Sequence, residues 1–595
     1  MAIESDRLET IVTSEVSEER VWGHVRHLVE TIPARISGEG GDVRAAAYYR
    51  AEMEASDLGV EWCEMDLLNS RAGSADLRVL APETRVLDAD CCLHIASTTA
   101  EGITAELVFV GPGGVTDYRG KDVRGKIVLA EVSYAPPTPE KARLAAIHGA
   151  VGIVLMNWGT ADMPYVPKRA LKAVWGNPTP TTAVQIPQLA GVAITRAAGE
   201  YLRELCGRGP VRVRLRAESP REWQTLVQPI GHLPAGALER PFIIVSGHFD
   251  CWPPGATDNA TGNGVMLEIA RVLARHTDDL RRAVVFAFWN GHEVAEAAGS
   301  TWFVDHAWDA IQRHAVAYLN IDSLGMMGGT RVVTASSQEL ARFHADVEQR
   351  ILGHAAEPRR LSRTGDQSFF GIGVPSVTGR FMHSAAQIEA WNGATLGWWN
   401  HTDQDTLDKI DRRLLATELK LWAAYVVRLA SEPVLPTRFQ PLALELQQAV
   451  ATLAAGGTDL LDLASLATLC DRLVQRTAAL DERADVLARR CADGSGAGPG
   501  EEATEMNECL LHLSRGLTAP ARSVAGRYGQ DSYGLTDLTA PIPALAPLAT
   551  LRALPPLSDE ARVLGTELRR RRNALADGVS DAVWLIDRTL AHVDA

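Results

Sequence analysis

The sequence predicts an α/β protein built on a mixed, mostly parallel sheet. Three apolar runs have the length of buried strands, and each leads into polar residues: Phe242–Val245, Ala283–Phe288 and Val316–Ile321. Apolar residues at helical spacing follow the first run, from Val265 onward. Because ligands of parallel α/β sheets bind at the carboxyl ends of the strands, the polar residues after these runs form the candidate functional site.

Five His, Asp and Glu residues after these strands have the pattern of a metal site. His248 and Asp258 follow the first strand, Glu293 the second and Asp322 the third, and His401 comes later in the chain. Two imidazoles and three carboxylates suit two divalent cations, with one carboxylate bridging them and open positions for water or substrate. One such residue is usually a cap or a solvated loop residue, but five together predict a metal centre.

The order of these motifs resembles the co-catalytic zinc aminopeptidase and glutamate carboxypeptidase family over about residues 20 to 430. The motifs are His248-Phe249-Asp250, Asp258-Asn259, Glu293, Asn320-Ile321-Asp322 and His401-Thr402. The resemblance implies two zinc ions, one bound by His248 and Asp322 and the other by Glu293 and His401. It also implies that Asp258 bridges the two ions and that Asp250 orients His248.

One motif departs from the family pattern. The family has two adjacent Glu residues after the second strand, a general base and a ligand, whereas this chain has His292-Glu293, with one extra residue before Gly299-Ser300. His292 could be the base, since its ordinary pKa of about 6.5 suits proton transfer near neutral pH and nearby cations would lower it. The alternatives are that His292 is an additional metal ligand, that Glu296 is the base, or that the reaction is not hydrolysis.

Three further residues are candidates for contact with the substrate. In the carboxypeptidases of this family, the stretch that matches Arg380 binds the terminal carboxylate of the substrate, which guanidinium recognises with two hydrogen bonds. A second arginine of those proteins is Met382 here, which favours aminopeptidase-like action. Asp366 lies in the element before Arg380. Trp399, beside His401, is either a wall of the substrate pocket or a core residue.

Pattern and resemblance together divide the chain into four parts. Residues 19–84 are assigned to the start of the catalytic domain, 85–222 to an inserted β-rich domain, 223–432 to the catalytic domain and 433–595 to a helical domain. The inserted part is similar to the protease-associated domain in its stretches Val123–Leu129 and Gly149–Leu155. Its loop Trp158–Trp175 is predicted to be a lid over the site or a plain surface loop. The resemblance implies a homodimer formed through the helical domain.

Composition excludes some classes of partner. The net charge of −15 argues against nucleic acid and against an anionic membrane surface. No apolar run reaches the ~18 residues of a membrane-spanning helix. The eight scattered Cys include no CxxC pair, which favours free thiols, and the acidic first residues do not read as a secretory signal. We therefore expect a cytoplasmic location, although related carboxypeptidases are often anchored outside cells.

Three hypotheses about function follow. The first is a two-zinc hydrolase that cleaves an amide bond of a small peptide or aminoacyl compound, in which a metal-bound hydroxide attacks the carbonyl. The second is altered chemistry on the same fold, a deamidase, cyclase or lyase that uses His292. The third is a non-catalytic binding protein of the transferrin receptor type, against which the five retained ligands argue.

Overall fold

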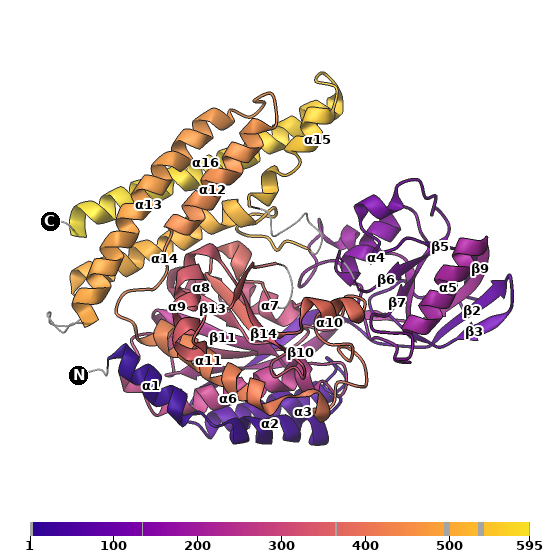
Figure 1. The fold of residues 1–595 in the computed structure, drawn as a ribbon, viewed down its shortest axis with the longest axis horizontal. Helices are drawn as coiled ribbons and strands as arrows, with labels where there is room; N and C mark the ends of the chain where they lie inside the picture. Colours follow the sequence, from indigo (N-terminus) through magenta and orange to yellow (C-terminus); the bar gives the residue numbers. More distant parts are fainter. Residues whose placement is uncertain (1–3, 134, 363–365, 493–499, 533–540, 594–595) are drawn as a thin grey trace.

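The computed structural model describes residues 4–133, 135–362, 366–492, 500–532 and 541–593, which form three parts (Figure 1). A central sheet with helices on both faces lies at the bottom left of the view, a second sheet lies to its right and a helical bundle lies above. The predicted α/β core, the inserted β-rich domain and the helical C-terminal region are confirmed. Within the described ranges, none of the helices combines the length and apolar character needed to cross a membrane.

The central sheet has eight strands in the order β1-β10-β12-β11-β13-β16-β14-β15. They are β1 (Gly59–Ser70), β10 (Arg221–Leu233), β11 (Phe242–His248), β12 (Ala283–Trp289), β13 (Ala315–Asn320), β14 (Arg331–Ser336), β15 (Glu357–Arg360) and β16 (Ser376–Met382). The central pairs β12–β11, β11–β13 and β13–β16 are parallel, as is the outer pair β14–β15, whereas the remaining pairs are antiparallel. Strands β11, β12 and β13 are buried along their whole length, which is why they read as unbroken apolar runs.

Helices cover both faces of this sheet. Alternate residues of β11 point to opposite faces, so that Ile243 and Val245 belong to one core cluster and Phe242 and Ile244 to another. The first face is covered by α1 (Ser5–Glu15), α2 (Glu18–Thr31), α3 (Gly41–Glu54), α6 (Thr261–Ala274), α9 (Ala341–Leu352) and α11 (Arg412–Ser431), and the second by α7 (Ala298–His306) and α8 (Trp308–His314). This packing holds the ends of β11, β12 and β13 at one edge of the sheet.

The inserted domain is built on a second eight-stranded sheet, in the order β3-β2-β9-β5-β6-β7-β8-β4. Its elements are β2 (Ala75–Ala81), β3 (Arg85–Leu87), β4 (Ala89–Cys91), β5 (Ile103–Phe109), β6 (Ile127–Glu131), α4 (Thr138–Ile147), β7 (Gly152–Met156), β8 (Ala190–Ile194), α5 (Arg196–Arg208) and β9 (Val211–Ala217). Strand β2 pairs with β9, so this sheet begins at Ala75, before the predicted boundary at residue 85. The pairing joins segments far apart in the sequence, which local patterns did not reveal.

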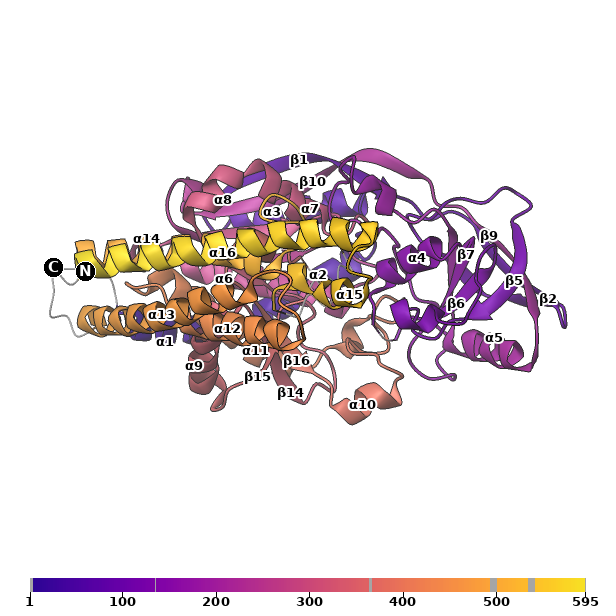
Figure 2. The same cartoon turned by 90° about the horizontal axis from the view of Figure 1, so that it is seen from above.

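The C-terminal region is a bundle of long helices. It comprises α12 (Gln440–Ala455), α13 (Leu463–Ala492), α14 (Glu501–Arg522), the short α15 (Leu548–Ala553) and α16 (Asp559–Val593). Helix α16 packs against both α13 and α14, and the long helices lie side by side when the molecule is turned (Figure 2). Buried Arg515 of α14 donates hydrogen bonds to carbonyls of the catalytic domain, including that of Ile311. The bundle is therefore joined to the central core by polar contacts as well as by apolar packing.

Candidate metal centre and active site

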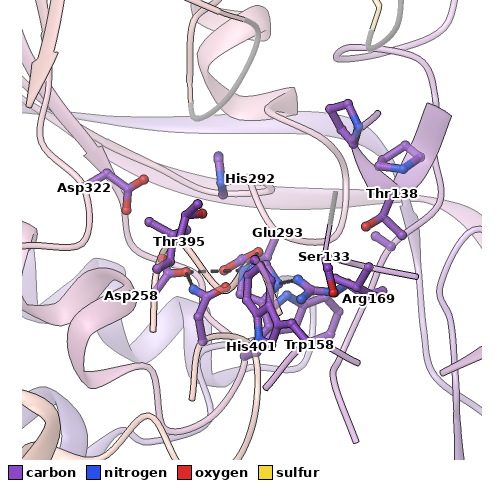
Figure 3. A pocket seen from close by; sticks show the side chains of 18 of the residues that line it. Ser133, Thr138, Trp158, Arg169, Asp258, His292, Glu293, Asp322, Thr395 and His401 are labelled. Carbon is purple, nitrogen blue, oxygen red and sulfur yellow. Dashed lines mark hydrogen bonds and ion pairs between the residues drawn. The ribbon is translucent and has the colours of Figure 1, made fainter. Parts of the chain in front are cut away.

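Five predicted ligands meet at the carboxyl edge of the central sheet, and Figure 3 labels four of them, Asp258, Glu293, Asp322 and His401. His248 is the last residue of β11, Glu293 follows β12, and Asp322 follows β13. Asp258 precedes α6, and His401 lies in the loop before α11. Because β11, β12 and β13 run in parallel, their ends bring these side chains to one place.

The ligand atoms form two groups that share Asp258. His248 Nε2 lies 3.1 Å from Asp258 Oδ1 and 3.4 Å from Asp322 Oδ1. His401 Nε2 lies 3.2 Å from Asp258 Oδ2 and 3.2 Å from Glu293 Oε2. The structure thus brings His248 together with Asp322, and Glu293 together with His401, and gives each group one oxygen of Asp258.

These groups fit two zinc ions. Atoms that bind a tetrahedral zinc at about 2.0–2.1 Å are separated from one another by roughly 3.3 Å, close to the distances observed. Glu293 Oε1 is buried and has no hydrogen-bond partner among the described residues. Burial raises the pKa of Asp258, but His248 and His401 outweigh it and hold that pKa well below the ordinary value. Asp258 is therefore an ionised carboxylate that faces two imidazoles, as a bridging ligand requires.

Two polar side chains that the sequence analysis missed hold Asp258 in place. Asp405 accepts hydrogen bonds from the backbone N–H of Thr257 (2.9 Å), the hydroxyl of Thr257 (2.6 Å) and the backbone N–H of Asp258 (3.0 Å). The amide nitrogen of Asn400 donates to Asp258 Oδ2 at 2.7 Å. Their closeness to His401 in the sequence was the available signal, since both flank the predicted ligand.

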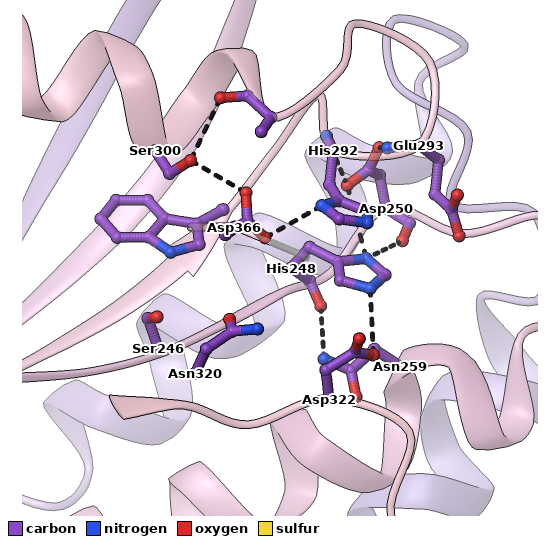
Figure 4. A network of polar contacts seen from close by, with 12 residues as sticks. Ser246, His248, Asp250, Asn259, His292, Glu293, Ser300, Asn320, Asp322 and Asp366 are labelled. Atoms are coloured by element: carbon purple, nitrogen blue, oxygen red, sulfur yellow. Dashed lines mark hydrogen bonds and ion pairs between the residues drawn. The ribbon is translucent and has the colours of Figure 1, made fainter. Parts of the chain in front are cut away.

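His292 is held by Asp366 (Figure 4). His292 Nδ1 lies 3.1 Å from Asp366 Oδ2, and Asp366 Oδ1 accepts a hydrogen bond from the hydroxyl of Ser300 at 2.9 Å. The imidazole also stacks on that of His248, with ring centroids 3.9 Å apart. Burial and His248 lower the pKa of His292, but Asp366 and Glu293 outweigh them and raise it to about 9.

Asp366 is therefore not a substrate contact. Its side chain is fully buried behind His292 and does not line the cavity. Its place before Arg380 in the chain suggested a position in the substrate site. The structure instead shows a carboxylate that orients an imidazole.

Asp250 acts on the metal centre in two ways. Its backbone carbonyl accepts the hydrogen bond of His248 Nδ1 at 2.9 Å, whereas its nearest carboxylate oxygen is 3.8 Å from that nitrogen. The carboxylate accepts from the backbone N–H groups of His292 (3.2 Å) and Glu293 (3.0 Å) and from the hydroxyl of Ser37 (2.7 Å). The main-chain carbonyl of Asp250 thus orients His248, as expected of this residue. The carboxylate of Asp250 positions the loop that carries Glu293.

A cavity of about 510 Å³ opens above the ligands, and the inserted domain forms one of its walls. His292, Glu296 and Arg380 line it from the catalytic domain. Both terminal nitrogens of Arg380 lie 3.5 Å from Asp322 Oδ2. The residues from the inserted domain are Val132, Ser133, Ala135, Pro136, Pro137, Thr138, Pro139, Trp158, Arg169 and Ala170.

Trp399 does not line this cavity. Its side chain is fully buried, packs with Met326 and Met382, and donates its indole N–H to the hydroxyl of Thr257 at 3.2 Å. It is therefore a core residue that supports the loop before Asp258. Of the two interpretations of Trp399, the structure favours the core residue over the pocket wall.

The predicted lid is in large part a fixed wall. Residues 169–175 are buried, and hydrogen bonds tie the segment to the ligand loops. The backbone N–H of Lys168 donates to the carbonyl of His401 (2.8 Å), Lys172 Nζ donates to the carbonyl of Ala295 (2.6 Å), and the N–H of Gly176 donates to the carbonyl of Glu296 (2.9 Å). We call residues 168–176 the wall segment; it clamps the loops that carry Glu293 and His401.

Arg169 of the wall segment is a site residue that the sequence did not single out. It is 7 % exposed, lines the cavity, and places its guanidinium carbon 5.0 Å from the centre of the Trp158 ring. One terminal nitrogen, Nη1, contacts His401 Nδ1. Burial lowers the pKa of Arg169 to about 10, so the guanidinium keeps its charge at neutral pH.

Comparison with known protein families identifies two domains in the chain. Residues 230–426 match Peptidase family M28, and residues 103–202 match the PA domain. The chain is 24 % identical over 498 residues to the probable glutamate carboxypeptidase VP8 of Zea mays, an alignment that covers 71 % of this chain and 69 % of the maize protein. It is 27 % identical over 311 residues to aminopeptidase YwaD of Bacillus subtilis, covering 51 % of this chain and 61 % of that protein.

Solved structures show the same fold. The zinc aminopeptidase BSAP from Bacillus subtilis superimposes with a TM-score of 0.54 at 21 % identity, covering 71 % of this chain and 97 % of that one. A peptidase M28 precursor from Shewanella amazonensis gives a TM-score of 0.57 at 18 % identity, covering 72 % and 97 %. The mixed sheet and its covering helices thus have the fold of these solved peptidases.

Proposed function

The chain carries a peptidase family M28 domain with an inserted PA domain, and on this premise we propose that it is a two-zinc, aminopeptidase-like hydrolase of small peptides. The observation that carries the proposal is the division of the ligands into two groups that share Asp258. A cavity of about 510 Å³ is in the usual range for sites that take small molecules. The substrate is therefore a short peptide or an aminoacyl amide.

The residues of the candidate metal centre have different roles in the proposed reaction. Zinc ions held by the two ligand groups would lower the pKa of a water molecule and polarise the scissile carbonyl. Asp258, Asp322 and Glu293 supply the negative charge that offsets these cations. Asn400 and Asp405 keep Asp258 between the two groups.

His292 is the general base in this proposal. Because Asp366 engages Nδ1, Nε2 is the ring nitrogen left for proton transfer, and the residue lines the cavity. Cations held by the two ligand groups would lower the pKa of His292 from the value that Asp366 and Glu293 give it, so that the imidazole is neutral near neutral pH. In this form His292 takes a proton from the attacking water at Nε2 and delivers it to the leaving amine nitrogen. Asp366 keeps the imidazole in the tautomer with its proton on Nδ1.

The test of this function combines metal content with hydrolysis of dipeptides. We expect purified protein to hold about two equivalents of zinc and to hydrolyse leucyl-leucine. Removal of zinc with a chelator is expected to abolish the hydrolysis, and added zinc to restore it. A zinc-loaded protein that cleaves none of a panel of dipeptides and aminoacyl amides would contradict the proposal.

We further propose that the protein is a cytoplasmic homodimer. The eight free thiols support a reducing compartment. Exposed apolar side chains on α16, Val563 and Trp584, support an interface on the helical bundle. Analytical ultracentrifugation tests the dimer, and a Trp584→Glu variant is expected to shift it toward the monomer. The net charge of −15 supports a peptide rather than a nucleic acid as the partner.

A further inference from the structure

A second cavity lies between the catalytic domain and the helical bundle. Its volume is about 830 Å³, within the usual range for sites that take small molecules. Pro241, Arg282 and His314 line it, and each comes directly before one of the strands β11, β12 and β13. The cavity is therefore at the amino edge of the central sheet, about 20 Å from the candidate metal ligands at ~3.3 Å per strand residue. We call it the amino-edge cavity.

Arginines that line the amino-edge cavity have few partners within the protein. The side chain of Arg281 forms no hydrogen bond or ion pair with the described residues. Arg313 reaches only Asp309, at 3.6 Å, and both of these side chains are exposed. The cavity is thus lined by guanidinium groups that the described protein leaves without a close carboxylate.

A third arginine, Arg282, is 5 % exposed and is fixed at the base of the same cavity. Its Nη1 donates hydrogen bonds to the carbonyls of Leu429 (2.9 Å) and Glu432 (2.7 Å) at the end of α11. Its Nε and Nη2 form no hydrogen bond with the described residues, and they are not among the fully buried atoms. Since Arg282 lines the cavity, these two nitrogens are available to a molecule bound there.

The charge of Arg282 persists at neutral pH. Burial, and to a smaller extent the charge of Arg281, lowers the pKa of Arg282 to about 10 against the opposing effect of Glu432. The two neighbouring guanidinium groups therefore repel each other across a partly buried space. An anion between them would relieve this repulsion.

Two carboxylates, those of Asp278 and Glu508, also line the amino-edge cavity. Neither forms an ion pair with Arg281, Arg282 or Arg313, and both residues are exposed. Water and salt screen exposed charges more strongly than buried ones. The positive charge of Arg282 therefore dominates the inner part of the cavity.

The inner part of the cavity also offers an apolar surface. Val316, Leu435 and Leu511 line it and are buried. At the rim, Asn507 of α14 accepts a hydrogen bond from the backbone N–H of Leu435 (2.7 Å) and donates one to the carbonyl of Pro433 (2.9 Å). These bonds fasten the bundle to the chain that leaves α11, so the cavity has fixed walls.

We propose that the amino-edge cavity binds a small organic anion. Its apolar body would lie against Val316, Leu435 and Leu511, and its carboxylate or phosphate group would face the arginines. Guanidinium recognises both groups with paired N–H donors. The bound molecule would contact both the catalytic domain and α14. This site is separate from the proposed hydrolase reaction, and the inference does not rest on that reaction.

Three probes that differ in one chemical group test the proposal: 4-phenylbutyrate, 4-phenylbutyl phosphate and 4-phenylbutanol. Calorimetry on the full zinc-loaded chain gives the Kd of each probe. The same measurement on Asp258→Ala, which is expected to hold no cation, separates the amino-edge cavity from anion binding at the metal centre.

Variants at exposed positions locate the binding. The double variant Arg281→Met and Arg313→Met removes two cations of the cavity without touching the core. Thr504→Trp, on α14, narrows the cavity from an exposed position. Arg275→Met is the matched control, because this arginine is 51 % exposed, pairs with Glu15 at 2.8 Å and does not line the cavity.

We expect an anionic probe to bind about tenfold or more tightly than 4-phenylbutanol, with one molecule per chain. The tighter of the two anionic probes identifies the carboxylate or the phosphate as the preferred group. The preference is expected to remain in Asp258→Ala and Arg275→Met and to be lost in the double arginine variant. Thr504→Trp should weaken the binding of all three probes.

Three results would overturn the proposal. The first is equal binding, or no binding, of the three probes by wild type. The second is a preference that disappears in Asp258→Ala, which would place the anion at the metal centre. The third is a preference that keeps its full size in the double arginine variant. Hydrolysis of leucyl-leucine is measured in parallel: its absence would refute the proposed function but not the anion site, and hydrolysis without selective anion binding would do the reverse.

Discussion

The two halves of the metal centre use the same kinds of ligand but differ in what surrounds them. In the half formed by His248 and Asp322, the second ring nitrogen of His248 donates to the backbone carbonyl of Asp250. In the half formed by Glu293 and His401, the second ring nitrogen of His401 faces the guanidinium of Arg169. A carbonyl fixes the imidazole in the form that binds a cation, whereas a guanidinium opposes it.

The two halves also differ in which domains supply the residues around them. The hydrogen-bond and ring partners of His248 within the described residues, Asp250, Asn259, Asn263 and His292, belong to the catalytic domain. The wall segment of the inserted domain, by contrast, clamps the loops that carry Glu293 and His401. We infer that the first half is ready for its cation once the catalytic domain folds. The second half depends on the docking of the inserted domain, and so couples cation binding to the wall of the substrate cavity.

The largest effect is expected from a variant that removes Asp258, the candidate ligand that the two halves share. Asp258→Ala deletes the carboxylate that contributes one oxygen to each group, and both cations are expected to be lost. Activity should then fall to background, a loss above about 10⁴-fold, because the cations supply the main activation of water and carbonyl. Zinc content by plasma mass spectrometry checks the cause. Asp403→Ala, at an exposed carboxylate two residues after His401, is the control that keeps both cations.

The next effect separates the candidates for the general base. His292→Ala is expected to lower kcat by about 10²–10⁴-fold with little change in zinc content. Asp366→Asn should lower kcat by a smaller factor, about tenfold or more, and change the pH profile, because the imidazole loses the carboxylate that orients it. Glu296→Gln is expected to stay within a few fold of wild type. A severe loss in Glu296→Gln with a mild one in His292→Ala would make Glu296 the base.

The third prediction tests whether the two halves bind zinc with different affinities. Zinc titration by calorimetry is expected to show two unequal affinities, with the weaker one assigned to the half beside Arg169. Arg169→Met should strengthen the weaker affinity by roughly tenfold, because an opposing cation next to His401 is removed. Lys168→Met is the matched control, because this neighbouring cation is 41 % exposed and pairs with Asp90 outside the cavity. Equal affinities in wild type would remove the distinction between the halves.

The affinity for zinc is expected to depend on pH in a defined direction. Burial lowers the pKa of His248, but Asp258 and Asp322 outweigh it, and the pKa is raised well above the ordinary value; the pKa of His401 is also raised, because Glu293 and Asp258 outweigh burial. Both imidazoles must lose their protons to bind zinc, so binding releases protons. Zinc affinity should therefore increase with pH across the neutral range and level off only above the raised pKa values of the two imidazoles. Calorimetry in buffers of different ionisation enthalpy counts the protons.

A smaller effect on zinc affinity is expected from a change at Asp405, which holds Asp258 in place. Asp405→Asn keeps the shape of the side chain but removes the charge that accepts hydrogen bonds from Thr257 and Asp258. Zinc affinity should fall by about tenfold, as is usual for groups that orient a ligand. An unchanged affinity would show that the main chain alone fixes Asp258.

The smallest expected effect concerns Trp399. Trp399→Phe removes the hydrogen bond to Thr257 and some buried volume, so the free energy of unfolding should fall by about 1–3 kcal/mol. KM is expected to stay within about twofold of wild type, because the side chain does not line the cavity. Thermal unfolding and steady-state kinetics measure the two quantities. A large rise in KM with an unchanged Tm would contradict the core role and show that Trp399 contacts the substrate.

Much of the centre was predictable because its ligands are tied to local patterns. His248, Glu293 and Asp322 each follow an apolar run, and the ends of parallel strands meet at one edge. The same reasoning was less reliable for side chains without such a strand. Asp366 and Trp399 were placed in the substrate site by their neighbours in the chain, but both side chains are fully buried behind it.

The sequence by itself determined the fold class, the five candidate ligand residues and the departure at His292, because strand length, the order of strands along the chain and residue type are local properties of the chain. Only the tertiary structure decided that Asp366 orients His292, that the main chain of Asp250 orients His248, and that Arg169 faces His401. Arg169 and His401 are 232 residues apart and belong to different domains. Their contact depends on how two separately built sheets dock, and no periodicity in the sequence records that docking.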